Sequence, residues 1–185
     1  MRTFHRTLVF AAICSLLPAA ALSPAARAAS KTEIDIKVTA SLEQFRKEIS
    51  GGSAFLEKAA GVLVFPEVLK AGFGVGGEYG EGALVIGGQT ADYYSTAAAS
   101  FGFQLGAQVK TIVLVFLAKD ALEKFRNSAG FEVGADGSVA LVELGTGVDI
   151  NTMNIQDPIV GFVLSNKGLM YNLTLEGTKI TKLNK

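Results

Sequence analysis

Three acidic residues lie close together in the middle of the sequence and are the first candidates for chemistry. Glu78, Glu81 and Asp92 could supply a carboxylate pair for glycoside hydrolysis or oxygen ligands for calcium. The segment contains no DxDxDG calcium loop, and no pattern fixes the distance between the carboxylates. We therefore interpret them as solvated carboxylates in turns and keep a carboxylate-based hydrolase as the less favoured alternative.

The glycine-rich run from Gly72 to Gly77 matches the GxGxxG pattern of dinucleotide-binding loops. Such a loop binds phosphate when its glycines form the turn between a strand and a helix. Here the run continues as EYGEGALVI, which is typical of a strand. We therefore interpret the glycines as bends within strands, and the sequence predicts no cofactor.

The first 28 residues have the parts of a cleavable signal peptide. Arg2 and Arg6 supply a positive start, an apolar run follows at 8–17, and Ala26-Arg27-Ala28 is a small-x-small cleavage signal. The apolar run is shorter than the roughly 20 residues of a membrane-spanning helix. We expect cleavage after Ala28, which predicts an exported protein that is periplasmic or secreted, with peripheral attachment to a membrane as an option. A retained membrane anchor is the alternative.

Cleavage at this point would leave residues 29–185 without thiol or imidazole chemistry. His5 and Cys14 are the only residues of their types, both lie in the signal segment, and the chain has no Trp. Thiol catalysis, structural zinc sites and catalysis by a His base, including the Ser-His-Asp triad, are thereby excluded. The remaining chain has 14 basic and 17 acidic residues, a net charge of −3, which argues against a nucleic-acid partner. The sequence predicts a protein that is not an enzyme, with no catalytic residues and no metal site.

Residues 31–49 have the pattern of an amphipathic helix. Apolar residues recur at spacings of three or four and define one face: Ile34, Val38, Leu42, Phe45 and Ile49. The other face mixes acidic and basic residues, so its electrostatic attraction to anionic lipid is weak. We favour packing of this helix on a sheet, with a position on a membrane surface as the alternative. A second helix is expected from Ser53 to Ala60, and a middle helix is expected to begin at Asp120 with Glu123 in a capping-box-like position.

The rest of the chain has the composition of strands. We expect one strand to end at Pro66 and two more, at 72–79 and 82–88, to be joined by a turn at Gly80-Glu81. Residues 112–117 are apolar throughout, as in a central strand that is covered on both faces.

Two further signals complete the predicted fold. Asp136-Gly137 is a strong hairpin signal, and the 21 glycines suit bulges and bends where a sheet curls or packs closely. The predicted fold class is α+β: a strongly curved, barrel-like antiparallel sheet with two N-terminal helices and one middle helix packed on it. We expect a single domain over residues 29–185.

Several blocks of the sequence, in order, resemble the SYLF domain, which is also described as a lipid-binding or actin-regulator domain. The blocks are GVLVFP at 61–66, KAGF at 70–73, the glycine ladder up to Gly82, YYS at 93–95, GFQLGAQ at 102–108, ALEKF at 121–125 and KGLMYNLTLEGTKI at 167–180. The similarity covers nearly the whole of residues 29–185. It is therefore far more specific than any single motif described above.

The resemblance implies binding of phospholipid without enzymatic activity, and some eukaryotic members also bind and bundle actin. Together with the apolar composition, 49% of residues, it predicts a phospholipid-binding module of the cell envelope, of the exported bacterial type. The candidate lipid-binding residues are Arg46, Lys47, Lys58 and Lys70 for headgroups, and Phe55 and Phe73 for acyl chains. The alternative is an envelope structural module or a module that binds a protein partner, with no specific lipid ligand.

Overall fold

The computed structural model describes residues 28–102, 108–142, 156–165, 168–169 and 175–185. Two helices come first, α1 (Lys31–Glu48) and α2 (Gly52–Glu57), and three long strands follow, β1 (Gly61–Ile86), β2 (Gln89–Gly102) and β3 (Gln108–Phe116). Helix α3 (Lys119–Asn127) precedes the short strands β4 (Phe131–Glu132), β5 (Ala140–Leu141), β6 (Ile159–Ser165), β7 (Gly168–Leu169) and β8 (Lys179–Leu183).

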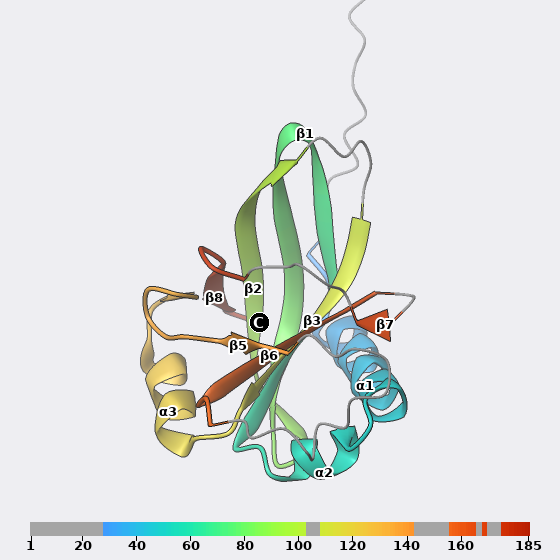
Figure 1. Cartoon of the computed structure of the whole chain (residues 1–185), viewed down its shortest axis with the longest axis vertical. Helices are drawn as coiled ribbons and strands as arrows, with labels where there is room; N and C mark the ends of the chain where they lie inside the picture. Colours follow the sequence, from blue (N-terminus) through green and yellow to red (C-terminus); the bar gives the residue numbers. More distant parts are fainter. Residues whose placement is uncertain (1–27, 103–107, 143–155, 166–167, 170–174) are drawn as a thin grey trace, which may run out of the picture.

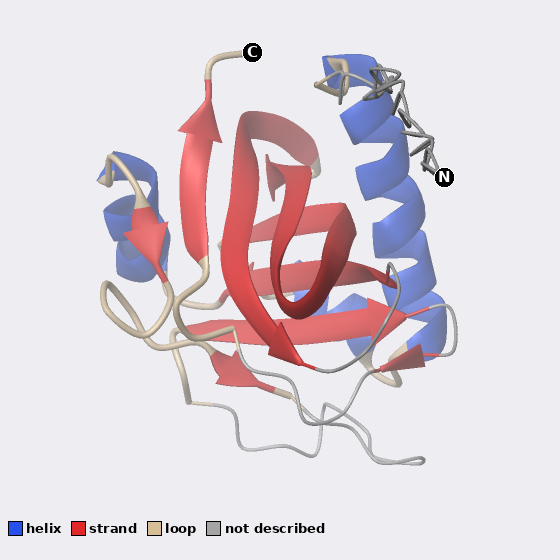
Figure 2. Cartoon of the chain, turned by 90° about the horizontal axis from the view of Figure 1, so that it is seen from above, coloured by secondary structure: helices blue, strands red, loops and turns tan. Residues whose placement is uncertain are grey.

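The eight strands form one curled sheet. Their order is β4-β8-β2-β1-β3-β6-β5, with β7 paired to β6. Figures 1 and 2 show the sheet curling into a half-barrel, with α1 along one side and α3 on the opposite side. The predicted α+β class with a barrel-like sheet and three helices is confirmed. One pair departs from the antiparallel prediction, because β5 runs parallel to β6.

Helix α1 forms as its sequence pattern predicts. The Ser30 side chain accepts a hydrogen bond from the Glu33 amide at 3.2 Å and so caps the first turn. The apolar face is buried against the sheet, and the Phe45 ring meets Phe162 of β6 edge-on with the ring centroids 4.8 Å apart. The prediction that this helix packs on a sheet is confirmed. Among the described residues, no helix has the length and apolar character needed to cross a membrane.

Strand β3 lies between β1 and β6 and is covered on both faces. Val113 and Val115 join the cluster beneath α1 and α2, whereas Ile112, Leu114 and Phe116 join the cluster that includes Phe125 of α3. This alternation follows from the two-residue period of a strand. The prediction of a central strand over 112–117 is confirmed, with the strand itself ending at Phe116.

Strand β1 continues through both places where the sequence suggests an interruption. At Pro66 the pairing with β3 shifts by one residue, since Phe65 pairs with Ile112 and Val68 pairs with Lys110. A bulge of this kind accommodates proline, which has no amide hydrogen for the ladder. The predicted turn at Gly80-Glu81 is also wrong. The chain turns instead at 87–88, where Gly87 and Gly88 adopt positive φ angles of 58° and 80°.

The two arms of β1 pack tightly against each other. A Cβ atom added to Gly82 would lie 2.0 Å from the carbonyl oxygen of Val64, and one added to Gly80 would lie 2.7 Å from that of Glu67. Only glycine allows backbone segments to approach this closely. The prediction that glycines serve close packing in a curled sheet is confirmed at these two positions.

Three local predictions differ from the structure. Helix α2 begins at Gly52 and ends at Glu57. Helix α3 has no capping box, because Ala118 is its N-cap and the Asp120 carboxylate accepts from the neighbouring amide of Ala121 instead. The chain turns at 134–136 and not at Asp136-Gly137, with Gly134 at a positive φ of 93°. The strands on its two sides pair elsewhere, β4 with β8 and β5 with β6. In the curled sheet, each of these two-residue strands pairs with a longer strand and not with the other.

Candidate functional site

The three carboxylates singled out in the sequence lie in strands and are ion-paired. Glu78 in β1 contacts Lys110 at 2.5 Å and Lys70 at 3.8 Å. Asp92 in β2 contacts Lys182 at 2.6 Å and Arg126 at 3.1 Å. These two side chains and that of Glu81, which pairs with Lys185 at 2.9 Å, are only 11–14% exposed. The interpretation as solvated turn carboxylates is therefore wrong.

These ion pairs give a hydrolase no support. Each carboxylate is bound by at least one ammonium or guanidinium group of the protein, so each serves in an ion pair and not as a free general acid. Within the described parts of the chain, no cluster of three or more His, Cys, Asp or Glu side chains is arranged to hold a metal ion.

The structure separates the predicted cationic residues into two groups. Arg46 and Lys47 are exposed in the last turn of α1, and Lys58 is exposed just after α2. Lys70 lies in the first arm of β1, near the bend that Figure 1 shows at the opposite end of the molecule from α2. The four cations therefore do not form one headgroup site.

The two aromatic residues predicted to contact acyl chains, Phe55 and Phe73, lie in α2 and β1. Phe55 is buried, and its ring packs edge-on against Phe162 with the centroids 5.8 Å apart, so it belongs to the core and faces no acyl chain in this structure. Phe73 lies in β1, and its side chain is outside the described part of the structure.

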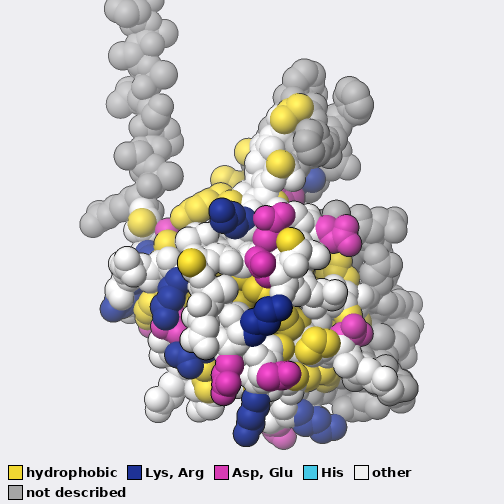
Figure 3. All heavy atoms as spheres, turned by 90° about the vertical axis from the view of Figure 1, so that its left-hand side faces the viewer, with side chains coloured by type: hydrophobic (Ala, Val, Ile, Leu, Met, Phe, Trp, Pro, Cys, Tyr) yellow, Lys and Arg dark blue, Asp and Glu magenta, His cyan; other side chains and the backbone are white. Residues whose placement is uncertain are grey.

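The end of the molecule near the β1 bend carries exposed apolar side chains that the sequence analysis missed. The described residues include five exposed large hydrophobic side chains, and four of them lie in this region: Leu69, Val75, Tyr79 and Val109. Leu69 and Val109 are paired across β1 and β3 and so lie side by side. Figure 3 shows hydrophobic side chains on the projecting end, whereas most charged side chains lie on the body below it.

A cleft of 650 Å³ lies beside this apolar end, between the start of α1 and the two arms of β1. Its apolar wall includes three of the four exposed side chains, Leu69, Tyr79 and Val109. Its polar rim consists of Glu33, Lys37, Glu67 and Glu81. We call this the α1–β1 cleft.

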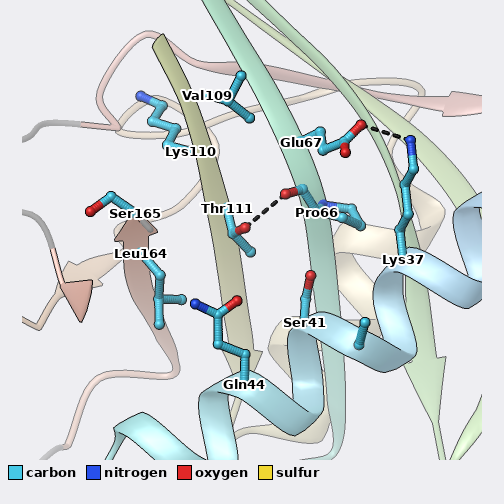
Figure 4. A pocket seen from close by; sticks show the side chains of 11 residues that line it. Lys37, Ser41, Gln44, Pro66, Glu67, Val109, Lys110, Thr111, Leu164 and Ser165 are labelled. Carbon is cyan, nitrogen blue, oxygen red and sulfur yellow. Dashed lines mark hydrogen bonds and ion pairs between the residues drawn. The ribbon is translucent and has the colours of Figure 1, made fainter. Parts of the chain in front are cut away.

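A smaller hollow of 270 Å³ adjoins the cleft and shares Lys37, Pro66, Glu67 and Val109 with it. Figure 4 shows Lys37 of α1 reaching Glu67 on the bulge of β1, at an N–O distance of 2.7 Å. In the same view, the Thr111 hydroxyl donates to the Pro66 carbonyl at 2.7 Å and supports the bulge. The bulge thus presents Glu67 to α1.

Two titratable groups at this rim are perturbed by their partners. Hydrogen bonds to Glu67 and Glu33 raise the pKa of Lys37, and the hydrogen bond to Lys37 lowers the pKa of Glu33. At the apolar wall, burial and then the bond to Glu81 raise the pKa of Tyr79. At neutral pH, the cleft therefore has a charged rim and a neutral apolar wall, an arrangement that suits an amphiphile.

Sequence reasoning missed this apolar wall for a physical reason. Leu69 and Val109 lie in apolar, β-branched segments, and such segments normally predict burial. Their exposure arises because the arms of β1 project beyond the helices that cover the rest of the sheet (Figure 1).

The model of the protein family described as Ysc84, Las17-binding protein actin regulator, matches residues 97–185. This part of the chain is similar to the SYLF domain family. The match contains the sequence blocks at 102–108, 121–125 and 167–180, whereas those at 61–82 and 93–95 lie before it. No curated protein matches the chain.

The SYLF domain is a binding and regulatory domain and not a known enzyme family. The matched residues include β3, with Val109 and Lys110, and the strands that complete the sheet. The rest of the α1–β1 cleft comes from residues that precede the matched range.

Proposed function

We propose that this protein is a phospholipid-binding module of the cell envelope that uses the projecting apolar end of β1 and β3. The observation that carries the proposal is the grouping of Leu69, Val75, Tyr79 and Val109, which are exposed at one end of an otherwise well-buried fold. Contiguous exposed apolar side chains in a soluble domain mark a contact with a membrane, a ligand or a protein. The resemblance to lipid-binding SYLF domains favours the membrane.

Charges near this end suit a lipid surface. Lys70 is partly exposed and lies next to Leu69, while Lys110 is buried and held by Glu78. Lys70 would contact the headgroups, and the apolar side chains would enter the acyl region. The alkyl part of a lysine at a membrane interface can lie along apolar surface while its ammonium group stays in water.

Helix α1 has a supporting role in this proposal. Its apolar face is buried in the core against Phe162 and its neighbours, so inserting that face into a membrane would require α1 to leave the sheet. Removing a buried aromatic side chain such as Phe45 from a core costs about 3–5 kcal/mol. Binding through the exposed end of β1 requires no such opening.

The test is co-sedimentation of the protein with zwitterionic and anionic vesicles at low and high salt. The double variant Leu69→Ser/Val109→Ser should lose most of its binding, because two adjacent apolar contacts are removed. Ile36→Ser is the matched control, since Ile36 is the remaining exposed large hydrophobic side chain among the described residues and lies on α1. Equal binding by the double variant and the control would contradict the proposal.

The second candidate is a module that binds a protein partner. The matching family is described as a Las17-binding protein, and an exposed apolar end can serve a protein contact equally well. Failure to bind any vesicle, together with a defined partner cross-linked through position 75 and lost in the double variant, would favour this function.

A further inference from the structure

The polypeptide just before α1 is fixed to the far end of the chain by one carboxylate. The amide nitrogen of Ala29 donates to Glu81 Oε2 at 3.1 Å, and Lys185 Nζ donates to the same oxygen at 2.9 Å. Lys185 Nζ also donates to the carbonyl oxygen of Ala29, and the Tyr79 hydroxyl donates to Glu81 Oε1 at 3.0 Å. Glu81 thus joins β1, the residues before α1 and the residue that ends the sequence.

Ala29 is also the first residue after the expected cleavage point. Hydrolysis of the Ala28–Ala29 peptide bond by a signal peptidase would add one water molecule, leaving a carboxylate on Ala28 and an ammonium group on Ala29. The nitrogen that donates to Glu81 as a peptide N–H would then carry a positive charge and three donors. We propose that cleavage after Ala28 creates an N-terminal ammonium group that binds Glu81 and locks the start of α1 to β1.

The surroundings of Glu81 favour such a bond. Its side chain is only 11% exposed, so solvent screens the attraction less than at an open surface. A hydrogen bond between two charged groups is stronger than one in which only the acceptor is charged. A positive charge just before a helix is otherwise unfavourable, because the N-terminal end of a helix carries partial positive charge, and Glu81 offsets this repulsion.

The cleft wall would change at the same step. Ala28 and Ala29 both line the α1–β1 cleft, so cleavage removes the first from the wall and places the charge of the second at the rim. The charged groups facing the new ammonium would be Glu81 and Lys185, with Glu33 near Lys185. The inference concerns the N-terminus alone and does not depend on lipid binding.

The first experiment expresses the full chain in a bacterial host and determines the N-terminal residue of the exported protein by mass spectrometry. We expect Ala29. A mature protein that begins at any other residue, or an unprocessed chain, would overturn the proposal.

The second experiment compares chains that begin at Ala29 and at Ala28, each alone and with Glu81→Gln. Both contain the whole described core, whose buried hydrophobic residues lie between Ile34 and Ile180. Glu81→Gln should lower Tm by about 2–4 °C more in the chain that begins at Ala29, which corresponds to roughly 1 kcal/mol for a domain of this size. Equal losses in the two chains would show that the ammonium adds nothing to the peptide contact.

A third measurement covers the case in which Glu81→Gln prevents folding. The α-amino group of the folded chain that begins at Ala29 should react with an acylating reagent several-fold more slowly than in the urea-unfolded chain, because the bound ammonium is less accessible. The chain that begins at Ala28 is the matched control. Protection equal to that control would overturn the proposal.

Discussion

The two ends of this molecule present different surfaces to a membrane. Near α2, the predicted headgroup ligands Arg46, Lys47 and Lys58 are exposed cations. Near the bend of β1 lie four exposed apolar side chains, and the buried Lys110 is already paired with Glu78. Three of the four predicted headgroup ligands therefore lie at the end near α2, and Lys70 lies near the exposed apolar side chains.

This separation has a measurable consequence. Binding through exposed cations weakens as salt increases, because the Debye length falls from about 10 Å at 0.1 M to about 3 Å at 1 M. Binding through apolar side chains persists at high salt, since it depends on area removed from water. Salt dependence therefore identifies the end of the molecule that contacts lipid.

The largest expected effect concerns the close packing that supports the apolar end. Gly82→Ala should destabilise the fold by about 3 kcal/mol or more, because its Cβ would lie 2.0 Å from the Val64 carbonyl oxygen and force the arms of β1 apart. Denaturant unfolding measures the change. Gly77→Ala in the same strand is the control: its Cβ would meet only the Ala98 carbonyl at 3.7 Å, so stability should change little. Similar losses in the two variants would contradict the packing argument.

The next effect breaks the apolar end without disturbing the core. Val75→Asp should reduce affinity for vesicles by about tenfold or more, since burying a charge in the acyl region opposes insertion. Because Val75 is 69% exposed, the melting temperature should remain within the range of ordinary surface substitutions. Vesicle co-sedimentation and thermal unfolding together check this prediction. Unchanged vesicle affinity would move the contact away from the β1 bend.

A smaller effect is expected at the cationic end. Reversing Arg46, Lys47 and Lys58 to Glu should weaken binding to anionic vesicles about two- to threefold at low salt and leave it unchanged at high salt. The same assay at two salt concentrations measures it. A loss larger than that of Val75→Asp would reverse the assignment of the two ends.

The smallest expected change in stability at neutral pH concerns a buried tyrosine, Tyr94, which we compare with the exposed Tyr79. Burial, and then the charge of Asp92, raise the pKa of Tyr94 to about 12, whereas Tyr79 lies at the exposed end. Since an unfolded tyrosine ionises near pH 10, Tyr94 contributes stability that is complete below about pH 10 and is lost as the pH rises through 12.

The Tyr94→Phe variant should remove this alkaline dependence. At neutral pH its stability should be unchanged or slightly higher, because the buried Tyr94 hydroxyl has no hydrogen-bond partner within the described part of the structure. Urea unfolding at pH 7 and pH 11 measures both effects, with Tyr79→Phe as the exposed control. If the two variants lost the same unfolding free energy between pH 7 and pH 11, the argument that burial raises the pKa of Tyr94 would be contradicted.

Much of the fold could be predicted from local patterns. The spacing of Ile34, Val38, Leu42 and Phe45 predicted a helix and its buried face, because residues three or four apart lie on the same side of a helix with 3.6 residues per turn. The apolar run at 112–117 predicted a strand that is covered on both faces.

Which strands pair with each other could not be predicted in the same way. Asp136-Gly137 has the residues of a hairpin turn, yet β4 and β5 pair with strands distant in the sequence. Proline at position 66 favours the end of a strand, yet β1 continues beyond it through a bulge. In both cases the local preference is worth less than the hydrogen bonds and apolar contacts that the curled sheet supplies.

The sequence alone determined the helices, the central strand, the glycine requirement and the resemblance to the SYLF domain, because each depends on residues near one another in the chain. Only the tertiary structure decided which charges are neutralised and which apolar residues remain exposed. The folding of β1 brings Glu78 into an ion pair with Lys110 and Glu81 into an ion pair with Lys185. It also leaves the Leu69 side chain exposed to solvent. Burial and ion pairing depend on neighbours in space, and the sequence does not specify these until the sheet has curled.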